Sequence, residues 1–180
     1  PDDNFEQALI DLGYDTYLDD YVVTDSINTV TYLSVSSQNI SDLTGIEDFT
    51  DLETLLCYQN QLNSVDVSNN TALIDLDLWD NNLTSLDVSQ NTVLEYLHCG
   101  NNNLTSLDVS NNTALTTLWC NSNQLTSLDV SQNTALEQLK FFVNQLTSLD
   151  VSANIALTVL SGRDNQLTSL DVSNNTLLET

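Results

Sequence analysis

The residues of this chain that are best suited to bind another molecule recur at matching positions of a repeated segment. Trp79 and Trp119 are its only tryptophans, His98 is its only histidine, and Lys140 and Arg163 are its only basic residues. All five lie in the variable half of the segment, beside neighbours that repeat almost unchanged. Aromatic and basic side chains supply much of the binding energy of interfaces when they lie together. The chemistry that these residues favour is therefore noncovalent recognition.

These residues belong to a larger set that faces one way if the segments stack in register. We predict that the ligand-binding residues are Tyr58, Asp77, Trp79, Tyr96, His98, Trp119, Asn121, Lys140, Phe142 and Arg163. The alternative is that tolerant surface positions have drifted. Drift on an acidic protein favours small polar residues rather than exposed aromatic ones, which leave an apolar patch when unpaired. Recognition is therefore the favoured interpretation.

Catalysis is not expected. His98 has no cysteine or histidine nearby at metal-ligand spacing, so neither a metal site nor an acid–base role is predicted for it. The chain has only four glycines and lacks a phosphate-binding loop, a nucleophile elbow and a zinc-binding helix motif. An open surface also excludes little water. We therefore predict a protein that is not an enzyme and has no catalytic residues and no cofactor.

The repeat itself must position these side chains. Leucine recurs at a constant interval, at positions 52, 73, 94, 115, 136, 157 and 178. In the unit that begins at Leu115, apolar residues and one asparagine follow at fixed offsets. They are Leu118, Cys120, Asn123, Leu125, Leu128 and Val130. This spacing is that of a leucine-rich repeat, whose short units cannot bury a core alone and must stack.

The predicted fold is a repeat solenoid. We expect a right-handed leucine-rich-repeat coil with a parallel concave β-sheet, short convex strands and an N-terminal helical cap. In the segment 117–121, period-two alternation sends Leu118 and Cys120 inward and leaves Trp119 outward. The recurring "SLDVS" also alternates and would supply the convex strands. The variable half thus lines the concave sheet, and the constant half, which ends in a polar turn with asparagine, builds the scaffold.

The pattern divides the chain into four parts. Residues 1–29 are an N-terminal cap made of a helix and a connector, and Asp3 is the expected helix N-cap in "PDDNFEQALIDLG". Residues 52–177 form six leucine-rich repeats of equal length, and residues 30–51 form a transitional repeat that is longer by a single position. Residues 178–180 begin a further repeat. Because a solenoid needs a polar cap at both ends, we expect the natural protein to continue or a partner to protect the last coil.

Three columns of identical residues accompany the repeat. The first, predicted to bond turn backbone inside the stack, consists of Asn60, Asn81, Asn102, Asn123, Asn144 and Asn165. The second, a candidate cation column on the convex face, consists of Asp66, Asp87, Asp108, Asp129, Asp150 and Asp171. We favour the alternative that these carboxylates accept bonds from serine hydroxyls or turn amides, since glycine-rich calcium loops are lacking. The third, Cys57, Cys99 and Cys120, is expected to be buried thiols rather than a disulfide or zinc site.

The charge of the chain limits its partners. Its 26 acidic residues stand against two basic ones, for a formal net charge of -24. Such a surface repels phosphate backbones and anionic lipid headgroups, so neither nucleic-acid binding nor membrane-surface binding is expected. No apolar run reaches the roughly 20 residues that span a bilayer, so no membrane insertion is predicted. The expected partner is a protein or a glycan.

The repeat "LTSLDVSNNTALTTLWC", together with "NISDLTGIEDFTDLETLLC" and "PDDNFEQALIDLG", resembles secreted and surface-anchored bacterial leucine-rich-repeat proteins of the internalin-like and BspA-type groups. This resemblance covers essentially the whole chain and implies an extracellular or cell-surface module for recognition and adhesion. One alternative is a structural spacer or self-association module of a larger surface protein, and a minor third option is ion binding along the aspartate column. Leu78, Phe141 and Gly162 depart from the pattern by replacing the core cysteine, and those units are still expected to stack.

Overall fold

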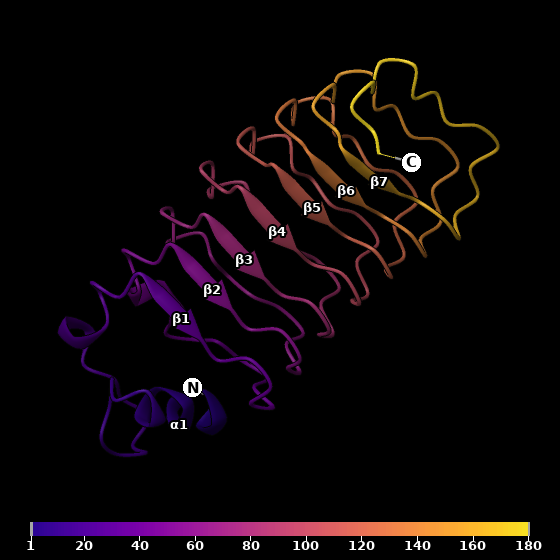
Figure 1. Ribbon diagram of the computed structural model, residues 1–180. Coiled ribbons are helices and arrows are strands. Elements are labelled where there is room, and N and C mark those ends of the chain that lie inside the picture. The colour runs from indigo at the N-terminus through magenta and orange to yellow at the C-terminus, as the bar shows by residue number, and fades with distance from the viewer. Residues whose placement is uncertain (1, 180) are drawn as a thin grey trace.

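The computed structural model describes residues 2–179 and is a stack of coils, each of which adds one strand to a parallel sheet (Figure 1). The strands are β1 (Tyr32–Ser34), β2 (Thr54–Leu56), β3 (Asp75–Asp77), β4 (Tyr96–His98), β5 (Thr117–Trp119), β6 (Gln138–Lys140) and β7 (Val159–Ser161). They lie side by side in chain order. From β2 onward the strands begin at the same constant interval as the leucines of the repeat. The predicted leucine-rich-repeat solenoid with a parallel sheet is confirmed.

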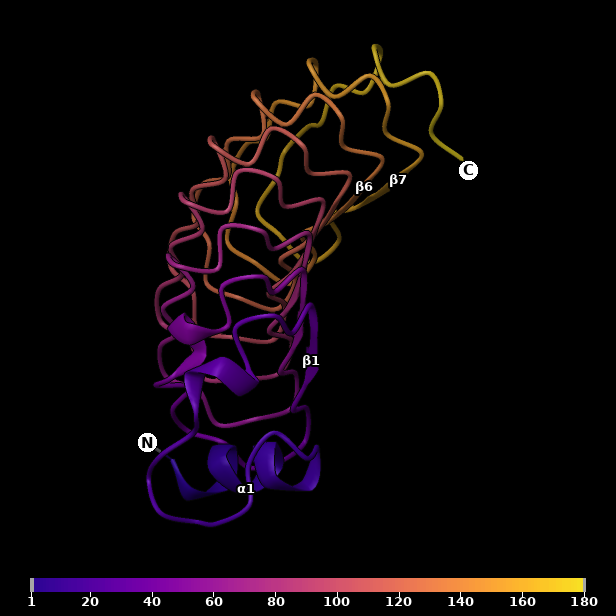
Figure 2. The ribbon, with the colours of Figure 1, turned by 90° about the vertical axis from the view of Figure 1, so that its left-hand side faces the viewer.

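The stack is curved, and the strands line its inner side. Figure 2 shows the coils bending toward the side on which β1, β6 and β7 lie. Strands in a sheet lie about 4.8 Å apart, and the bulkier turns opposite the sheet are spaced more widely. The sheet therefore forms the concave face of the molecule.

The central residue of each strand points into the core. Leu55, Leu76, Leu97, Leu118 and Leu139 are fully buried, whereas most of the residues that flank them in the strands are half-buried or exposed on the concave side. This is the period-two alternation of a β-strand. The inward and outward assignments made from the repeat hold for these strands, except that Thr117, expected to face outward, is buried.

The cysteines form part of a second buried column. Cys57, Cys99 and Cys120 are free and fully buried, as predicted. Burial raises the pKa of the Cys120 thiol to about 12, because a thiolate there would lose its hydration. The pKa of the Cys57 thiol is raised for the same reason.

Phe141 and Gly162 occupy the same column in adjacent coils and fit each other. A Cβ atom at Gly162 would lie 2.0 Å from Cζ of Phe141 and 2.5 Å from Cε2. The phenyl ring therefore fills the space that a side chain at Gly162 would need. The coils still stack, as expected, because a large residue in one is matched by the absence of a side chain in the next.

The predicted asparagine ladder is present. In Asn81, Nδ2 donates to the carbonyl oxygens of Cys57 at 3.0 Å and Leu78 at 3.1 Å, and Oδ1 accepts from the N–H of Leu62 at 3.0 Å. The other members of the column make equivalent bonds within their own coil and to the preceding coil. The ladder therefore supplies partners to backbone groups that would otherwise be unpaired in the interior.

A second asparagine ladder runs through the turn of the constant half. Its members are Asn70, Asn91, Asn112, Asn133, Asn154 and Asn175, and all are buried. Nδ2 of Asn112 donates to the carbonyl oxygens of Val88 at 2.9 Å and Asn91 at 2.8 Å, both in the preceding coil. The turn that the repeat predicts to be polar is therefore buried at its asparagine, which hydrogen-bonds adjacent coils to each other.

The convex face departs from the prediction, because the expected convex strands are reduced to one isolated parallel bridge, Asp87 to Asp108, among residues 2–179. The cause lies within "SLDVS". Oδ1 of Asp87 accepts the N–H of Ser89 at 2.9 Å, and Asp108 does the same for Ser110. An N–H group closed into such an Asx turn is not available to the neighbouring coil.

The N-terminal segment forms the predicted helix, α1 (Asp3–Asp11). Its N-cap is Asp2 rather than Asp3, since Oδ1 of Asp2 accepts the N–H of Asn4 at 2.8 Å and of Phe5 at 3.3 Å. Gly13 follows the helix with a φ of 83°, a conformation that glycine adopts without strain. No helix among residues 2–179 is long and apolar enough to cross a membrane.

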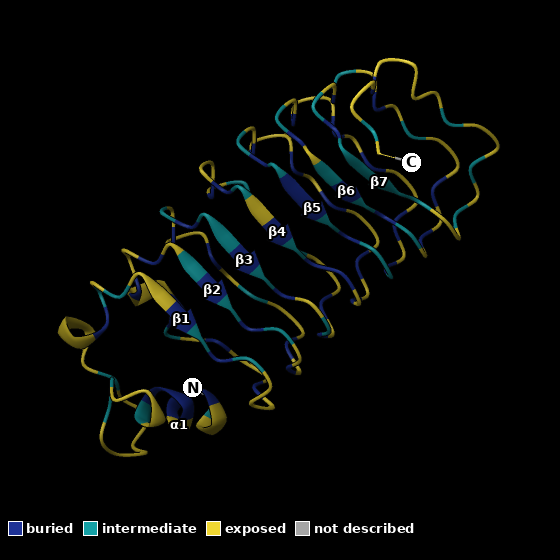
Figure 3. Cartoon of the chain, in the orientation of Figure 1, coloured by how far each residue is buried: buried dark blue, intermediate teal, exposed yellow. Residues whose placement is uncertain are grey.

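The helix covers one end of the stack. Phe5, Ala8 and Leu9 are buried in the same apolar cluster as the core leucines of the coils. Two 3-10 helices, η1 (Thr24–Ser26) and η2 (Ile46–Asp48), lie in the first turns. The last coil has no such cover among the described residues, and Figure 3 shows it mostly exposed or half-buried. Thr180, the last residue of the expected further repeat, and Pro1, the first of the expected cap, lie outside the described residues.

Candidate functional site

The last residue of each strand contributes to one row across the concave sheet, the strand-end row. From β2 to β7 its members are Leu56, Asp77, His98, Trp119, Lys140 and Ser161, each in register with the next. Neighbouring strands lie about 4.8 Å apart, so side chains that point the same way come into contact. This row thus gathers residues that are a full repeat apart in the chain.

Trp119 is enclosed by its two neighbours in the strand-end row. The rings of His98 and Trp119 are stacked, with centroids 4.2 Å apart and planes inclined by 4°. Nζ of Lys140 lies 3.4 Å from the centroid of the Trp119 ring. Because β4 and β6 flank β5, His98 and Lys140 cover opposite faces of the indole. Trp119 therefore presents an edge rather than a free face, and its buried Nε1 is not part of that edge.

Asp77 is bonded on both carboxylate oxygens. Oδ2 lies 3.4 Å from Nδ1 of His98, and Oδ1 accepts the N–H of Trp79 at 2.9 Å. Asp75 begins the same strand and is half-buried, and this burial raises the pKa of its carboxyl group. His98 opposes the rise and Asp77 adds to it. The carboxylate of Asp77, at the acidic end of the row, is therefore already hydrogen-bonded within the protein.

A second row, the turn row, lies two residues further along each coil. Its members are Tyr58, Trp79, Gly100, Asn121, Phe142 and Arg163. The carbonyl oxygens from Trp79 to Arg163 accept an N–H of the preceding coil at 2.8–3.1 Å. The residue after each member has a left-handed backbone, with φ between 54° and 59°. The turn row is therefore held in register by main-chain bonds, like the strands.

Gly100 interrupts the turn row between Trp79 and Asn121. A Cβ atom there would lie 3.0 Å from both the backbone oxygen and Oδ1 of Asn121, and 3.1 Å from its Nδ2. The amide group of Asn121 thus lies over the glycine, in the space that a side chain would take. Trp79 is 40% exposed, and its row places no side chain beside it on the β4 side.

The two rows enclose a hollow of about 480 Å³, the concave hollow. It is lined by Tyr58, Asp77, Trp79, His98, Gly100, Trp119, Asn121, Lys140, Phe142 and Ser161. These residues come from six successive coils, β2 to β7. The hollow therefore exists only because the coils stack in register.

Most of the predicted ligand-binding residues line the concave hollow, but two do not. Tyr96 begins β4, at the other end of the strand from His98. Arg163 lies beyond the hollow, with its guanidinium carbon 5.0 Å from the centroid of the Phe142 ring and Nη1 2.6 Å from Oδ2 of Asp164.

Two residues that line the concave hollow, Gly100 and Ser161, were not among the predicted ligand-binding residues. Neither carries an aromatic or charged group that would single it out. Their place in the two rows is the one sequence signal that points to them, since each lies at an outward position of the repeat.

The aspartates of the convex column accept bonds from the turns that hold them. Oδ1 of each accepts the N–H of the serine two residues later, at 2.8–3.0 Å. The backbone and hydroxyl bonds from Ser110 hold the pKa of the Asp108 carboxyl below its ordinary value, and the other members are lowered in the same way. The carboxylates therefore have partners within the chain, as the favoured interpretation expected, and cation binding by this column stays a prediction.

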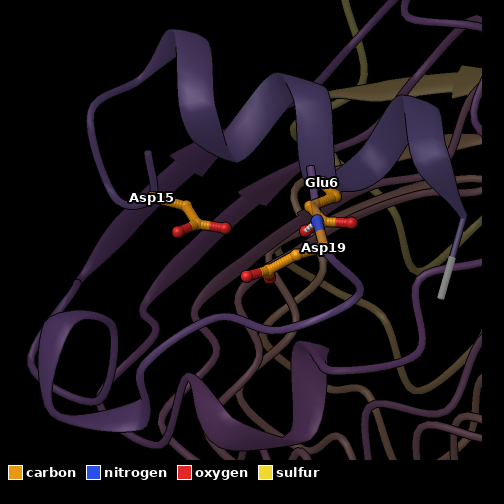
Figure 4. Close-up of side chains that lie close together, drawn as sticks. All are labelled: Glu6, Asp15 and Asp19. Atoms are coloured by element: carbon orange, nitrogen blue, oxygen red, sulfur yellow. Dashed lines mark hydrogen bonds between the residues drawn. The ribbon is translucent and has the colours of Figure 1, made fainter. Parts of the chain in front are cut away.

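An acidic cluster lies beside α1, in a part of the molecule that the repeat does not reach. Ligand atoms of Glu6, Asp15 and Asp19 all lie within 4.8 Å of one another (Figure 4). Glu6 is buried, and its carboxylate accepts the N–H groups of Asp19 at 2.7 Å, Asp20 at 3.1 Å and Tyr21 at 3.4 Å. These bonds satisfy the buried charge and anchor the loop after the helix.

Known proteins resemble this chain in sequence. The profile of the family described as "Leucine Rich repeats (2 copies)" matches residues 92–133. The chain is 42% identical to internalin J of Listeria monocytogenes over 71 residues, which are 39% of this chain and 8% of that protein. The matched segment is therefore a small part of the relative's length.

Two solved structures resemble the coiled stack. The functional domain of InlJ from Listeria monocytogenes, which includes a cysteine ladder, is 35% identical, with a TM-score of 0.62 over 99% of this chain and 49% of that chain. Internalin C2 from the same organism is 19% identical, with a TM-score of 0.73 over 99% of this chain and 91% of that chain. The second likeness concerns the fold alone, and this chain spans about half of the InlJ domain.

Proposed function

We propose that this chain, which resembles internalin-like leucine-rich-repeat proteins, is a recognition and adhesion module that binds a protein or glycan ligand through its concave face. The concave hollow is the observation that carries this function. It combines aromatic side chains from neighbouring coils with a few polar groups in one depression. Binding sites commonly have this composition, in which apolar surface supplies affinity and a few polar groups set orientation.

Binding without catalysis fits the chemistry of the strand-end row. His98 lies between Asp77 and the ring of Trp119, so the neighbour beyond the imidazole is an indole and not a nucleophile. The hollow is also open along the sheet, where water would compete with any developing charge. The role we assign to the row is therefore to shape a surface.

The location we propose is outside the bacterial cell, free or attached to its surface. It is supported by the resemblance of the whole repeat to secreted and surface-anchored bacterial leucine-rich-repeat proteins and by the similarity to internalin J. The net charge of -24 favours a partner that is neither a nucleic acid nor an anionic membrane.

Trp79 offers the sharpest test of this function. Arrays of extracellular host proteins and of oligosaccharides would be probed with the wild type, Trp79→Ala and Tyr32→Ala. Tyr32 is 54% exposed on β1, in the same sheet but outside the concave hollow, so it is a matched aromatic control. We expect at least one array signal that Trp79→Ala loses and Tyr32→Ala keeps.

Two results would contradict the concave recognition function. One is a set of array signals that does not change in Trp79→Ala. The other is self-association of the wild type in sedimentation equilibrium that Trp79→Ala abolishes, because the concave face would then join copies of the chain. Trp119 is not used in this test because its loss would also remove the ring that His98 and Lys140 contact.

A further inference from the structure

We propose that the concave hollow contains a saccharide subsite, in which a pyranose ring of a glycan stacks on the exposed indole of Trp79 while its hydroxyl groups bond the side-chain amide of Asn121. This inference rests on the proposed function and narrows its ligand to one class. A pyranose has an apolar face of C–H groups and a rim of hydroxyls. It therefore matches an aromatic platform with a neutral polar group at its side.

Among the two tryptophans, Trp79 is the one with a face to offer. Both faces of Trp119 are covered, by His98 at 4.2 Å and by Nζ of Lys140 at 3.4 Å from the ring centroid. Trp79 is exposed, and Gly100 takes the place of the neighbour that would stand beside it in the turn row. A flat ligand can therefore lie against Trp79, whereas Trp119 would meet it edge-on.

Asn121 supplies the polar groups. Its amide lies over Gly100, next to the Trp79 position of the row, and among the described residues its Nδ2 makes only a long contact of 3.5 Å, to Oγ of Ser122. A primary amide offers a donor and an acceptor side by side, which suits two adjacent hydroxyl groups.

The charged residues of the hollow favour a neutral ring over a charged peptide side chain. Both oxygens of Asp77 already have partners, Nδ1 of His98 and the N–H of Trp79. Lys140 directs its ammonium group to the ring of Trp119. A ligand that carried its own charge into the hollow would have to displace these contacts, whereas hydroxyl groups would not.

The size of the hollow also suits a saccharide. About 480 Å³ lies within the range of small-ligand sites, roughly 300 to 1,000 Å³. A stable protein partner needs about 800 Å² of contact on each side, which is the scale of a whole sheet face rather than one depression. A short stretch of glycan fills the hollow without that larger surface.

Gly100 is a positioning residue in this subsite. It has no left-handed φ, so its backbone accepts alanine, but the added Cβ would lie 3.0–3.1 Å from the backbone oxygen and amide atoms of Asn121. The amide would have to move away from Trp79. Gly100→Ala should therefore weaken saccharide binding while Trp79 itself is unchanged.

The test uses an oligosaccharide array, followed by titration of the wild type and variants with the array member that binds the wild type most tightly. We expect Trp79→Ala to weaken binding about tenfold or more and Gly100→Ala several-fold, with Tyr32→Ala unchanged. Circular dichroism and urea unfolding of each variant would show that the stack is intact.

The two tryptophans provide an independent readout. In Trp119→Phe, Trp79 is the only fluorophore of its kind, and the oligosaccharide should shift its emission. In Trp79→Phe, only Trp119 remains, and its emission should stay nearly constant because both ring faces are already covered. A shift confined to the Trp119 signal would overturn the stacking on Trp79.

The outcomes separate the saccharide subsite from the broader function. If no oligosaccharide binds at millimolar concentration, or if Trp79→Ala binds as the wild type does, the saccharide subsite is overturned. If Trp79→Ala loses a protein signal on the host array while no oligosaccharide binds, the concave face recognises a protein and only the ligand class is wrong. If no signal of either kind depends on Trp79, both proposals fail.

Discussion

Two sets of side chains in this molecule stack from coil to coil with the same spacing, but one makes identical contacts at each step and the other makes different ones. The buried asparagine columns repeat one residue in every coil and make the same bonds each time, as Asn81 and Asn112 show. The strand-end row changes residue at every strand and makes different contacts at each step, as between Asp77 and His98 or between His98 and Trp119. Parallel, in-register stacking thus produces a buried hydrogen-bonded column where one residue is repeated, and a candidate binding surface where the residues differ.

The difference between these two regions lies in what the backbone requires of them. Buried backbone N–H and carbonyl groups must be hydrogen-bonded, and the same asparagine contributes to this in every coil. On the concave face the main chain is already paired by the sheet, and side chains are free to differ. We therefore expect substitutions in the asparagine columns to act on stability and those in the concave face to act mainly on binding.

The strongest test of this contrast is Asn81→Ala. It would leave the buried N–H of Leu62 without the Oδ1 acceptor of Asn81, at a cost of about 1–3 kcal/mol, and it would remove the two bonds from Nδ2 to the carbonyl oxygens of Cys57 and Leu78, at about 0.5–1.5 kcal/mol each. We expect a loss of about 2–6 kcal/mol in the free energy of unfolding, measured by urea denaturation. Asn82→Ala is the matched control, because Asn82 is exposed and should change stability by less than about 0.5 kcal/mol. Equal losses for the two neighbours would remove the contrast.

A smaller effect is expected where the core column itself varies. Gly162→Ala would force its Cβ against the ring of Phe141, which is fully buried and has little room to move. Overpacking of this kind destabilises by about 1–3 kcal/mol. In the double variant with Phe141→Leu, the smaller side chain should relieve the clash. A double-mutant cycle should therefore show a loss of stability for the double variant that is smaller than the sum of the losses of the two single variants. Strict additivity would show that the two residues do not share this space.

The repeat predicts the solenoid and the direction of each side chain, since leucines at a constant interval and period-two alternation leave few other arrangements. It does not predict how neighbouring side chains settle against each other. Nothing in the spacing shows that His98 stacks on Trp119, or that the amide of Asn121 lies over Gly100. Those contacts depend on side-chain rotamers, which the register allows but does not choose.

Local hydrogen bonds explain the remaining differences from the prediction. The alternation of "SLDVS" is typical of a strand, but the aspartate within it bonds the serine amide two residues later and removes it from the ladder, as at Asp87. The helix begins one residue earlier than predicted, because Asp2 and Asp3 are equally suited to be an N-cap and only the backbone geometry distinguishes them.

Within the concave face, the two tryptophans should differ in their effect on stability. Trp119→Ala removes the stack on His98 and the cation–π contact with Lys140, for a loss of about 1–2 kcal/mol in the free energy of unfolding. Trp79→Ala removes an exposed ring and should cost less than about 0.5 kcal/mol. Thermal and urea unfolding of both variants would measure the difference. If Trp79→Ala proved the more destabilising, Trp79 would belong to the scaffold rather than to the free surface.

The smallest expected effect is a gain in stability, at the residue that follows the turn row. The residue after the turn row has a left-handed φ in every coil from Gln59 to Asp164, and in one coil this residue is Val143, with a φ of 55°. A β-branched side chain is strained there by about 1–2 kcal/mol, whereas asparagine adopts the conformation readily. Because Val143 is 42% exposed, Val143→Asn gives up little burial and should raise the free energy of unfolding by about 1 kcal/mol.

The control for Val143→Asn is Val93→Asn, at a residue that is 46% exposed and has no left-handed φ. It matches the change in polarity without the relief of strain, so urea unfolding should show no gain. A gain in stability at Val143 alone would show that the left-handed backbone restricts which residues fit at the position after the turn row. Equal changes in the free energy of unfolding at Val143 and Val93 would mean that the left-handed backbone does not restrict the side chain at this position.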